Sequence, residues 1–147
     1  MSAKVRLVLA GGVLAGAIYA AADSAPANAA ASCHGCGRAI TNPKVTGTIV
    51  ADGTVQRFRT PACMARYISE TGTMAARLTY VTDWPSGREI RAERALFVQA
   101  TVDRLTFERD YLAFLSADAA RQVAWQRASE VIDWPALLVR ASEQPTD

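Results

Sequence analysis

The pattern of apolar and polar positions divides the chain into short β-prone runs and stretches with helical periodicity. Residues 46–50 and 54–58 are rich in β-branched and other strand-forming side chains, and Asp52-Gly53, a strong hairpin signal, lies between them. We therefore expect a β-hairpin. Thr60-Pro61 follows as an N-cap and a first-turn proline, and a short helix is predicted from there to Gly72.

The second part of the chain contains similar signals. Residues 78–83 alternate and carry β-branched and aromatic side chains, as strands do, and they end at the turn sequence 84–87. A helix is predicted from the Ser116 cap to about Ala128, with its apolar residues on one face. The other expected elements are a strand pair at 89–91 and 95–102, an irregular stretch to Leu115, a closing strand at 130–133 and a helical turn at 135–140.

An internal repeat indicates how these elements combine. The sequence Val81-Thr82-Asp83-Trp84-Pro85 recurs in similar form as Val131-Ile132-Asp133-Trp134-Pro135, each time after a predicted helix. Chance recurrence of a tripeptide is the alternative, but each half also contains strand, strand, helix and strand in that order. We therefore predict an α+β fold of two similar ββαβ units with antiparallel sheets, at residues 46–87 and 88–147, the second including a C-terminal tail.

The N-terminal segment has the order of features found in a secretory signal peptide. Basic residues precede an apolar run at 7–22, and Ala27-Asn28-Ala29 then supplies small residues for cleavage after Ala29. Residues 1–29 are therefore predicted to be a signal peptide, and the protein to be periplasmic. One alternative is a retained membrane anchor, for which the run is short and rich in Gly and Ala. The other is a lipoprotein modified at Cys33.

Composition and charge exclude several classes of function. The chain has 147 residues, 50% of them hydrophobic, which is enough to form the core of one domain. Its 16 Lys and Arg residues and 14 Asp and Glu residues give a net charge of +2, too small for a protein that binds nucleic acid through its phosphates. His34 is the single histidine, so a Ser/His/Asp triad or a zinc site would have to be built around it. We predict that the protein is not an enzyme.

Candidate chemistry is concentrated in the three cysteines. Cys33 and Cys36 belong to a Gly-rich loop at 30–45 that can wrap two sulfurs around one ion. Cys63 falls at the third position of the first predicted helix, where the helix dipole is expected to lower its pKa. Met64 adds a thioether, and soft sulfur donors of this kind select Cu(I) and Zn²⁺. The candidate metal ligands are Cys33, His34, Cys36, Cys63 and Met64.

Other interpretations of the cysteines stay open. Cys33 and Cys36 could form a structural disulfide, with Cys63 buried as a small apolar residue, in a secreted structural or interaction module that carries no metal. Structural zinc held by the three cysteines and His34 is chemically complete, although His34 lies inside the C-x-x-C loop. Because all three cysteines lie in the first half of the chain and its leader, the second half is predicted to be scaffold.

The order of motifs along the mature region resembles that of the NosL family, exported copper-binding accessory proteins of nitrous oxide reductase. The resemblance implies two similar ββαβ units, a fold related to that of organomercurial lyase. It also implies binding of Cu(I) and its delivery to a periplasmic metalloprotein such as nitrous oxide reductase. The matching segments are Cys36-Gly37-Arg38, Phe58-Arg59-Thr60-Pro61-Ala62-Cys63-Met64, Tyr80-Val81-Thr82-Asp83, Ala95-Leu96-Phe97-Val98 and Ala113-Phe114-Leu115-Ser116.

The chain departs from the family pattern beside both cysteine motifs. Arg38 stands at the place of the methionine in the family's C-x-M motif, and Arg59-Thr60 stands where the family has an acidic pair. A guanidinium cannot bind Cu(I), so copper binding is expected to depend on the three cysteines and Met64. The relation to organomercurial lyase also raises the hypothesis of a thiol-handling enzyme with Cys63 as its nucleophile, which rests on fold-level analogy.

Overall fold

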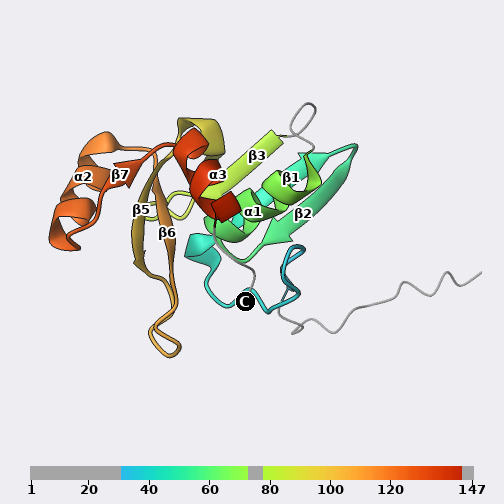
Figure 1. Cartoon of the computed structure of the whole chain (residues 1–147), viewed down its shortest axis with the longest axis horizontal. Coiled ribbons are helices and arrows are strands. Elements are labelled where there is room, and N and C mark those ends of the chain that lie inside the picture. Colours follow the sequence, from blue (N-terminus) through green and yellow to red (C-terminus); the bar gives the residue numbers. More distant parts are fainter. Residues whose placement is uncertain (1–30, 73–77, 144–147) are drawn as a thin grey trace, which may run out of the picture.

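The computed structural model describes residues 31–72 and 78–143, which form two antiparallel sheets with helices packed against them (Figure 1). The predicted signal peptide at 1–29 lies outside the described residues. Within the described ranges, no helix is long and apolar enough to cross a membrane.

The first sheet has four antiparallel strands in the order β2-β1-β3-β4. The predicted hairpin joins β1 to β2, and its turn places Asp52 and Gly53 at φ values of 49° and 73°, the left-handed conformation that a tight hairpin turn needs. Helix α1 (Pro61–Thr71) packs on this sheet, and Gly72 ends it at φ 64°. The strands are β1 (Gly47–Ala51), β2 (Thr54–Phe58), β3 (Leu78–Thr82) and β4 (Glu89–Arg91).

The second sheet repeats this arrangement with three strands in the order β6-β5-β7. Helix α2 (Ala117–Gln126) lies between β6 and β7 in the chain, as α1 lies between β2 and β3. Both halves thus contain a ββαβ unit with equivalent strand order, which confirms the predicted fold class. The remaining elements are β5 (Leu96–Thr101), β6 (Arg109–Phe114), β7 (Val131–Ile132), α3 (Trp134–Glu143) and the 3-10 turns η1 (Pro43–Val45) and η2 (Ala92–Arg94).

Two predictions about the middle of the chain are wrong. The strands expected to pair with one another, 89–91 and 95–102, belong to different sheets: β4 pairs with β3, and β5 pairs with β6 and β7. The first sheet therefore extends past residue 87, the expected end of the first unit. The stretch expected to be irregular contains β6, of which every residue after Arg109 is buried. Strands covered on both faces lose the alternation that identifies a strand in sequence.

Two apolar clusters form the core. The larger cluster takes residues from both sheets and from α1 and α3, and its bulkiest members include Phe58, Phe97 and Leu137. Figure 1 shows α3 beside α1, and the two helices are in contact. The smaller cluster lies between α2 and the second sheet and includes Leu112 and Phe114. Because both units contribute to the larger cluster, neither unit buries its apolar face alone.

The two aspartates of the Asp-Trp-Pro repeat make the same local contact. Asp83 accepts the backbone N–H of Ser86 at 3.2 Å, and Asp133 caps α3 by accepting the N–H of Ala136 at 3.0 Å. Asp83 also joins the two units, since its carboxylate accepts a hydrogen bond from the backbone N–H of Leu115 at 2.9 Å. The repeat therefore follows the similar architecture of the two units, and one copy has an additional role at their junction.

Candidate metal centre

The predicted cysteine loop is a closed turn at the start of the described chain. Ser32 and Ala39 pair across its base, and the backbone N–H of Cys33 donates to the carbonyl of Arg38 at 2.8 Å. The N–H of Gly37 donates to the carbonyl of Cys33 at 2.9 Å, with Gly37 at φ 71°, a left-handed conformation that glycine adopts readily. The turn therefore brings both sulfurs of the C-x-x-C motif to the same place.

Two contacts hold this loop against the first unit. The backbone N–H of His34 donates to the carbonyl of Arg57 on β2 at 2.7 Å. Gly35 lies so close to α1 that a Cβ atom there would be 3.3 Å from Sγ of Cys63, which leaves little room for a side chain. The glycine between the two cysteines of the loop therefore permits its close approach to the helix.

Helix α1 presents Cys63 through its N-terminal cap, as the sequence predicts. The side chain of Thr60 accepts a hydrogen bond from the N–H of Cys63 at 3.2 Å, and Pro61 begins the helix. Asp110 on β6 accepts the N–H of Ala62, also at 3.2 Å. The second unit thus holds the first turn of the helix that carries Cys63.

The three cysteine sulfurs converge. Their Sγ atoms all lie within 4.8 Å of one another, and those of Cys33 and Cys63, which are 30 positions apart in sequence, are separated by 3.3 Å. Cys33 is buried, with 2% of its surface exposed, Cys63 is half-buried and Cys36 is exposed. The cluster can hold a metal ion, and solvent reaches it through Cys36.

The pKa values of Cys33 and Cys63 are shifted in opposite directions. The pKa of Cys33 is lowered to about 4, mainly because the thiol of Cys63 donates a hydrogen bond to it, with further help from the backbone N–H groups of Cys36 and Arg59. The pKa of Cys63 is raised, first because its proton is held by Cys33 and then by burial. The expectation that the helix terminus lowers the pKa of Cys63 is therefore wrong. The N–H of Cys63 is directed to the capping hydroxyl instead of the sulfur.

A buried ion pair adjoins the sulfurs. The guanidinium of Arg59 makes two hydrogen bonds to the carboxylate of Glu108, one of them 2.6 Å long, and Arg38 lies 3.7 Å from the same carboxylate. The contact with Glu108 raises the pKa of Arg59, as does a weaker hydrogen bond with Cys36, and Arg59 in turn lowers the pKa of Glu108. Arg59 therefore stays protonated beside the cluster, where it can balance the charge of thiolates.

The second half of the chain is more than the scaffold that the cysteine positions predict. Glu108 holds Arg59, and Asp110 holds the first turn of α1, so two acidic groups from one short stretch of the second unit support the cluster. These contacts join residues 49 and 48 positions apart, for which no local pattern exists. Arg59 stands where the NosL family has an acidic residue. This departure was the sequence signal that could have indicated an acidic side chain paired with Arg59.

His34 and Met64, the other two predicted ligands, pack against apolar groups. The His34 ring lies edge-on to Phe58 and Tyr67, with centroid distances of 5.9 and 5.1 Å. Met64 is fully buried, and a Cβ atom at Gly47 on β1 would lie 2.9 Å from its sulfur. Among the described His, Cys, Asp and Glu side chains, the group close enough to share an ion consists of the three cysteines. Metal binding by His34 or Met64 stays a prediction.

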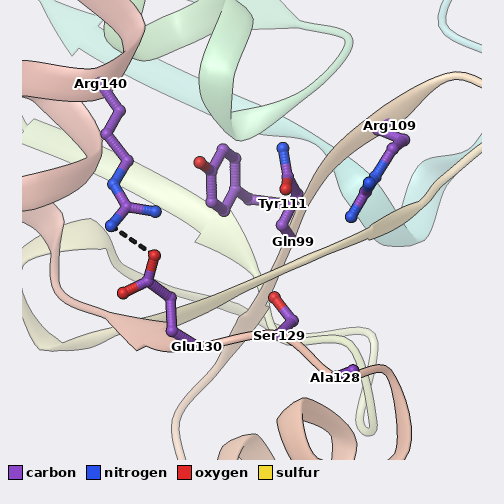
Figure 2. Close-up of a pocket in the computed structure, with 7 residues that line it drawn as sticks. All are labelled: Gln99, Arg109, Tyr111, Ala128, Ser129, Glu130 and Arg140. Atoms are coloured by element: carbon purple, nitrogen blue, oxygen red, sulfur yellow. Dashed lines mark ion pairs between the residues drawn. The ribbon is translucent and has the colours of Figure 1, made fainter.

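A separate pocket of about 400 Å³ lies in the second unit and shares no residue with the cysteine cluster. Figure 2 shows Gln99 and Tyr111 between Arg109 and Arg140, and the ion pair of Arg140 with Glu130, 2.6 Å long. Its lining is polar and contains no sulfur. The cysteine cluster is therefore the candidate site for a soft metal ion within the described ranges.

Among the comparisons with known proteins, the comparison of structures supports the fold, whereas the comparisons of sequence found no match. No protein-family model matches the sequence, and no curated protein matches it. The structure is similar to the crystal structure of the copper chaperone NosL from Shewanella denitrificans, with a TM-score of 0.61 and 18% sequence identity over 71% of this chain and 87% of that chain. The chain therefore has a NosL-like fold, as the resemblance of its motifs implied.

Proposed function

We propose that this protein is an exported copper chaperone that binds Cu(I) through cysteine sulfur and passes it to a periplasmic metalloprotein. The observation that carries the proposal is the convergence of Cys33, Cys36 and Cys63, whose Sγ atoms lie within 4.8 Å of one another. The similarity of the fold to a copper chaperone supports copper as the cargo. The cluster consists of three potential sulfur ligands, and Arg59 beside it can balance their negative charge. This composition fits a metal carrier that catalyses no reaction.

The number of converging ligands favours Cu(I) over the zinc alternative. Three thiolates bound at ~2.3 Å around one ion would have sulfurs about 4 Å apart, which is inside the observed limit of 4.8 Å. Cys33 and Cys63 would only need to separate slightly from 3.3 Å. Soft sulfur donors bind both Cu(I) and Zn²⁺, but structural Zn²⁺ sites take four ligands. A donor set of three sulfurs is therefore better matched to Cu(I).

The burial of the sulfurs supports transfer by ligand exchange. Cys36 is exposed while Cys33 is buried, so an incoming ligand of an acceptor can displace Cys36 first while Cys33 and Cys63 retain the ion. Arg59 lies beside Cys36 and offsets part of the negative charge that three thiolates bring to a Cu(I) ion. Release would then begin at the solvent side of the site.

The compartment and the acceptor are proposed from the sequence. The features at 1–29 support export to the periplasm, and the motif resemblance to the NosL family supports a copper enzyme such as nitrous oxide reductase as the acceptor. Contact with a membrane would require a retained leader or lipidation at Cys33. Lipidation would convert the sulfur of Cys33 into a thioether, so it would remove the thiolate on which the proposed site depends.

Competition with a Cu(I) chelator tests the proposal. The reduced mature protein is expected to bind Cu(I), and Cys36→Ser and Cys63→Ser are each expected to weaken binding by about tenfold or more, equivalent to about 1.4 kcal/mol. Circular dichroism and thermal unfolding check that both variants fold. Unchanged affinity in both variants would remove copper binding by this cluster as the function.

A secreted structural or interaction module is the second candidate, because two sulfurs at 3.3 Å could be oxidised in an oxidising compartment. The alternative left open by the sequence is a bond between Cys33 and Cys36, whereas the sulfurs of Cys33 and Cys63 lie 3.3 Å apart. Thiol counting and peptide mapping of protein isolated from the periplasm distinguish the candidates. A disulfide and no metal support the module, while three thiols with bound copper support the chaperone.

A further inference from the structure

The loop that connects β5 to β6 exposes two large apolar side chains. Leu105 is 92% exposed and Phe107 is 77% exposed. Figure 1 shows this hairpin end projecting from the body of the second unit. Single exposed apolar residues are common, but two on one projecting tip form a small apolar surface that the described residues leave uncovered.

Backbone contacts define the conformation of this tip. The N–H of Val102 donates to the carbonyl of Glu108 at 2.9 Å and closes the loop, and the Asp103 carboxylate accepts the N–H groups of the residues two and three positions on at 2.8 and 3.2 Å. Phe107 has a φ of 55°, which is costly for a bulky residue. The loop therefore holds an aromatic ring outward in a strained conformation, a feature found at functional surfaces.

The same loop is tied to the sulfur cluster. Glu108, at its end, holds the guanidinium of Arg59, whose pKa is raised further by the neighbouring Cys36. At its start, the carbonyl of Val102 accepts a hydrogen bond from the side chain of Asn42 at 3.4 Å, in the segment that follows the cysteine loop. The base of the projecting tip therefore adjoins the groups that surround the exposed cysteine of the site.

We propose that Leu105 and Phe107 form the docking surface for the protein that receives the copper. This inference rests on the proposed function, because ligand exchange requires the acceptor to touch Cys36. The charged side chains of the tip and its surroundings are those of Arg38, Arg104 and Arg109 and the carboxylate of Asp103. Glu108 is already paired with Arg59, so positive charge is in excess. Charge complementarity therefore identifies the partner as a copper protein with an apolar recess bordered by acidic side chains.

Site-specific photo-crosslinking of the full chain in its own host tests the inference. Leu105→p-benzoylphenylalanine and Phe107→p-benzoylphenylalanine are expected to give adducts with one protein, identified by mass spectrometry as a copper protein. The same substitution at Trp125 is the matched control, because this aromatic residue is 86% exposed but lies on α2, away from the sulfur cluster (Figure 1). Trp125→p-benzoylphenylalanine is expected to give no such adduct.

Charge reversal supplies a second readout. Arg104→Glu, introduced into the Phe107 crosslinking protein, is expected to lower the adduct yield by about tenfold if acidic groups of the acceptor face it. Arg127→Glu, an exposed arginine after α2, is the control and is expected to leave the yield unchanged. An equal effect of both reversals would overturn the proposed charge complementarity.

The remaining outcomes separate this inference from the proposed function. Equal adducts from positions 105, 107 and 125, no adduct from 105 and 107, or an adduct with a second copy of this chain or a copper-free protein would overturn docking at the tip. Cu(I) competition with the same purified variants, expected to match wild type, is measured in parallel. If the wild-type protein binds no Cu(I), the proposed function fails; if it binds Cu(I) and the tip gives no copper-protein adduct, the docking inference alone fails.

Discussion

Cys33 and Cys63 differ in the hydrogen-bond donors that face their sulfur atoms. The sulfur of Cys33 accepts from the thiol of Cys63 and from two backbone N–H groups, whereas the N–H of Cys63 is directed to the hydroxyl of Thr60. A helix N-terminus favours a thiolate only when its free N–H groups reach the sulfur. The capping residue that positions Cys63 thus also explains why the thiolate belongs to Cys33.

Replacing Cys63 by alanine is expected to raise the pKa of Cys33 above about 4, because the largest stabilising contact of its thiolate is the hydrogen bond from Cys63. The ultraviolet absorbance of the thiolate during a pH titration of the reduced, metal-free protein measures this pKa. Cys36→Ala is the control and is expected to have a smaller effect, since its side chain makes the smallest of these contributions. A pKa unchanged by Cys63→Ala would show that the two thiols do not share a proton.

Met64 is expected to contribute packing more than copper binding. Its side chain is fully buried against Gly47, and Met64→Leu keeps its volume at a cost below about 1.5 kcal/mol. We expect this variant to change the Cu(I) affinity by less than about tenfold, measured by chelator competition. Met64→Ala, in contrast, is expected to destabilise the fold by about 2–5 kcal/mol. A larger loss of affinity in Met64→Leu, with stability retained, would identify the thioether as a ligand.

At the scale of elements, local sequence signals were sufficient to predict tight turns and helix ends, because these positions strongly prefer particular residue types. Asp52-Gly53 predicted the first hairpin, and Thr60 with Gly72 predicted both ends of α1. The strand β6 was missed because its buried residues do not alternate. The contact of Arg59 with Glu108 was missed because its partner comes from a different unit. Sequence therefore predicted the cysteines that converge better than the groups that support them.

Loss of the α1 cap is expected to weaken both the fold and the site. Thr60→Ala removes the acceptor for the N–H of Cys63, which should cost about 0.5–2 kcal/mol of stability and lower the Cu(I) affinity. Thr60→Ser is expected to restore both. Urea unfolding and chelator competition measure the two effects.

The duplicated architecture supplies a matched control for this prediction. Ser116 caps α2 as Thr60 caps α1, accepting the N–H of Ala119 at 3.4 Å. Ser116→Ala is therefore expected to reduce stability through the same kind of contact and to leave the Cu(I) affinity unchanged. If Ser116→Ala lowers the affinity as much as Thr60→Ala does, the effect of the cap is a general loss of stability.

At the scale of the whole molecule, the two units share an architecture, and the described cysteine cluster belongs to the first unit. Cys63 and Ala119 occupy equivalent positions, each donating its N–H to the capping hydroxyl of its helix, so the second unit lacks the sulfur at that place. It contributes carboxylates instead, because Glu108 and Asp110 reach across to the first unit. The site is therefore complete only when the two units are packed together.

The junction between the units is expected to make stability depend on pH through Asp110. Burial raises the pKa of this carboxyl to about 6, against the opposing effect of hydrogen bonds from Thr60, Tyr111 and Ala62. The folded protein therefore binds the proton more tightly than the unfolded chain does, whose ordinary value is 3.8. Stability is highest below this ordinary value and is lost as the pH rises through about 6.

Asp110→Asn isolates this contribution, because an amide side chain does not titrate and its oxygen can still accept the N–H of Ala62. Wild type is expected to lose up to about 3 kcal/mol of stability between about pH 4 and pH 7 relative to the variant. Urea unfolding of both proteins at the two pH values measures the difference, and titrations common to both cancel. Parallel pH profiles would show that the Asp110 carboxyl binds its proton equally in the folded and unfolded states.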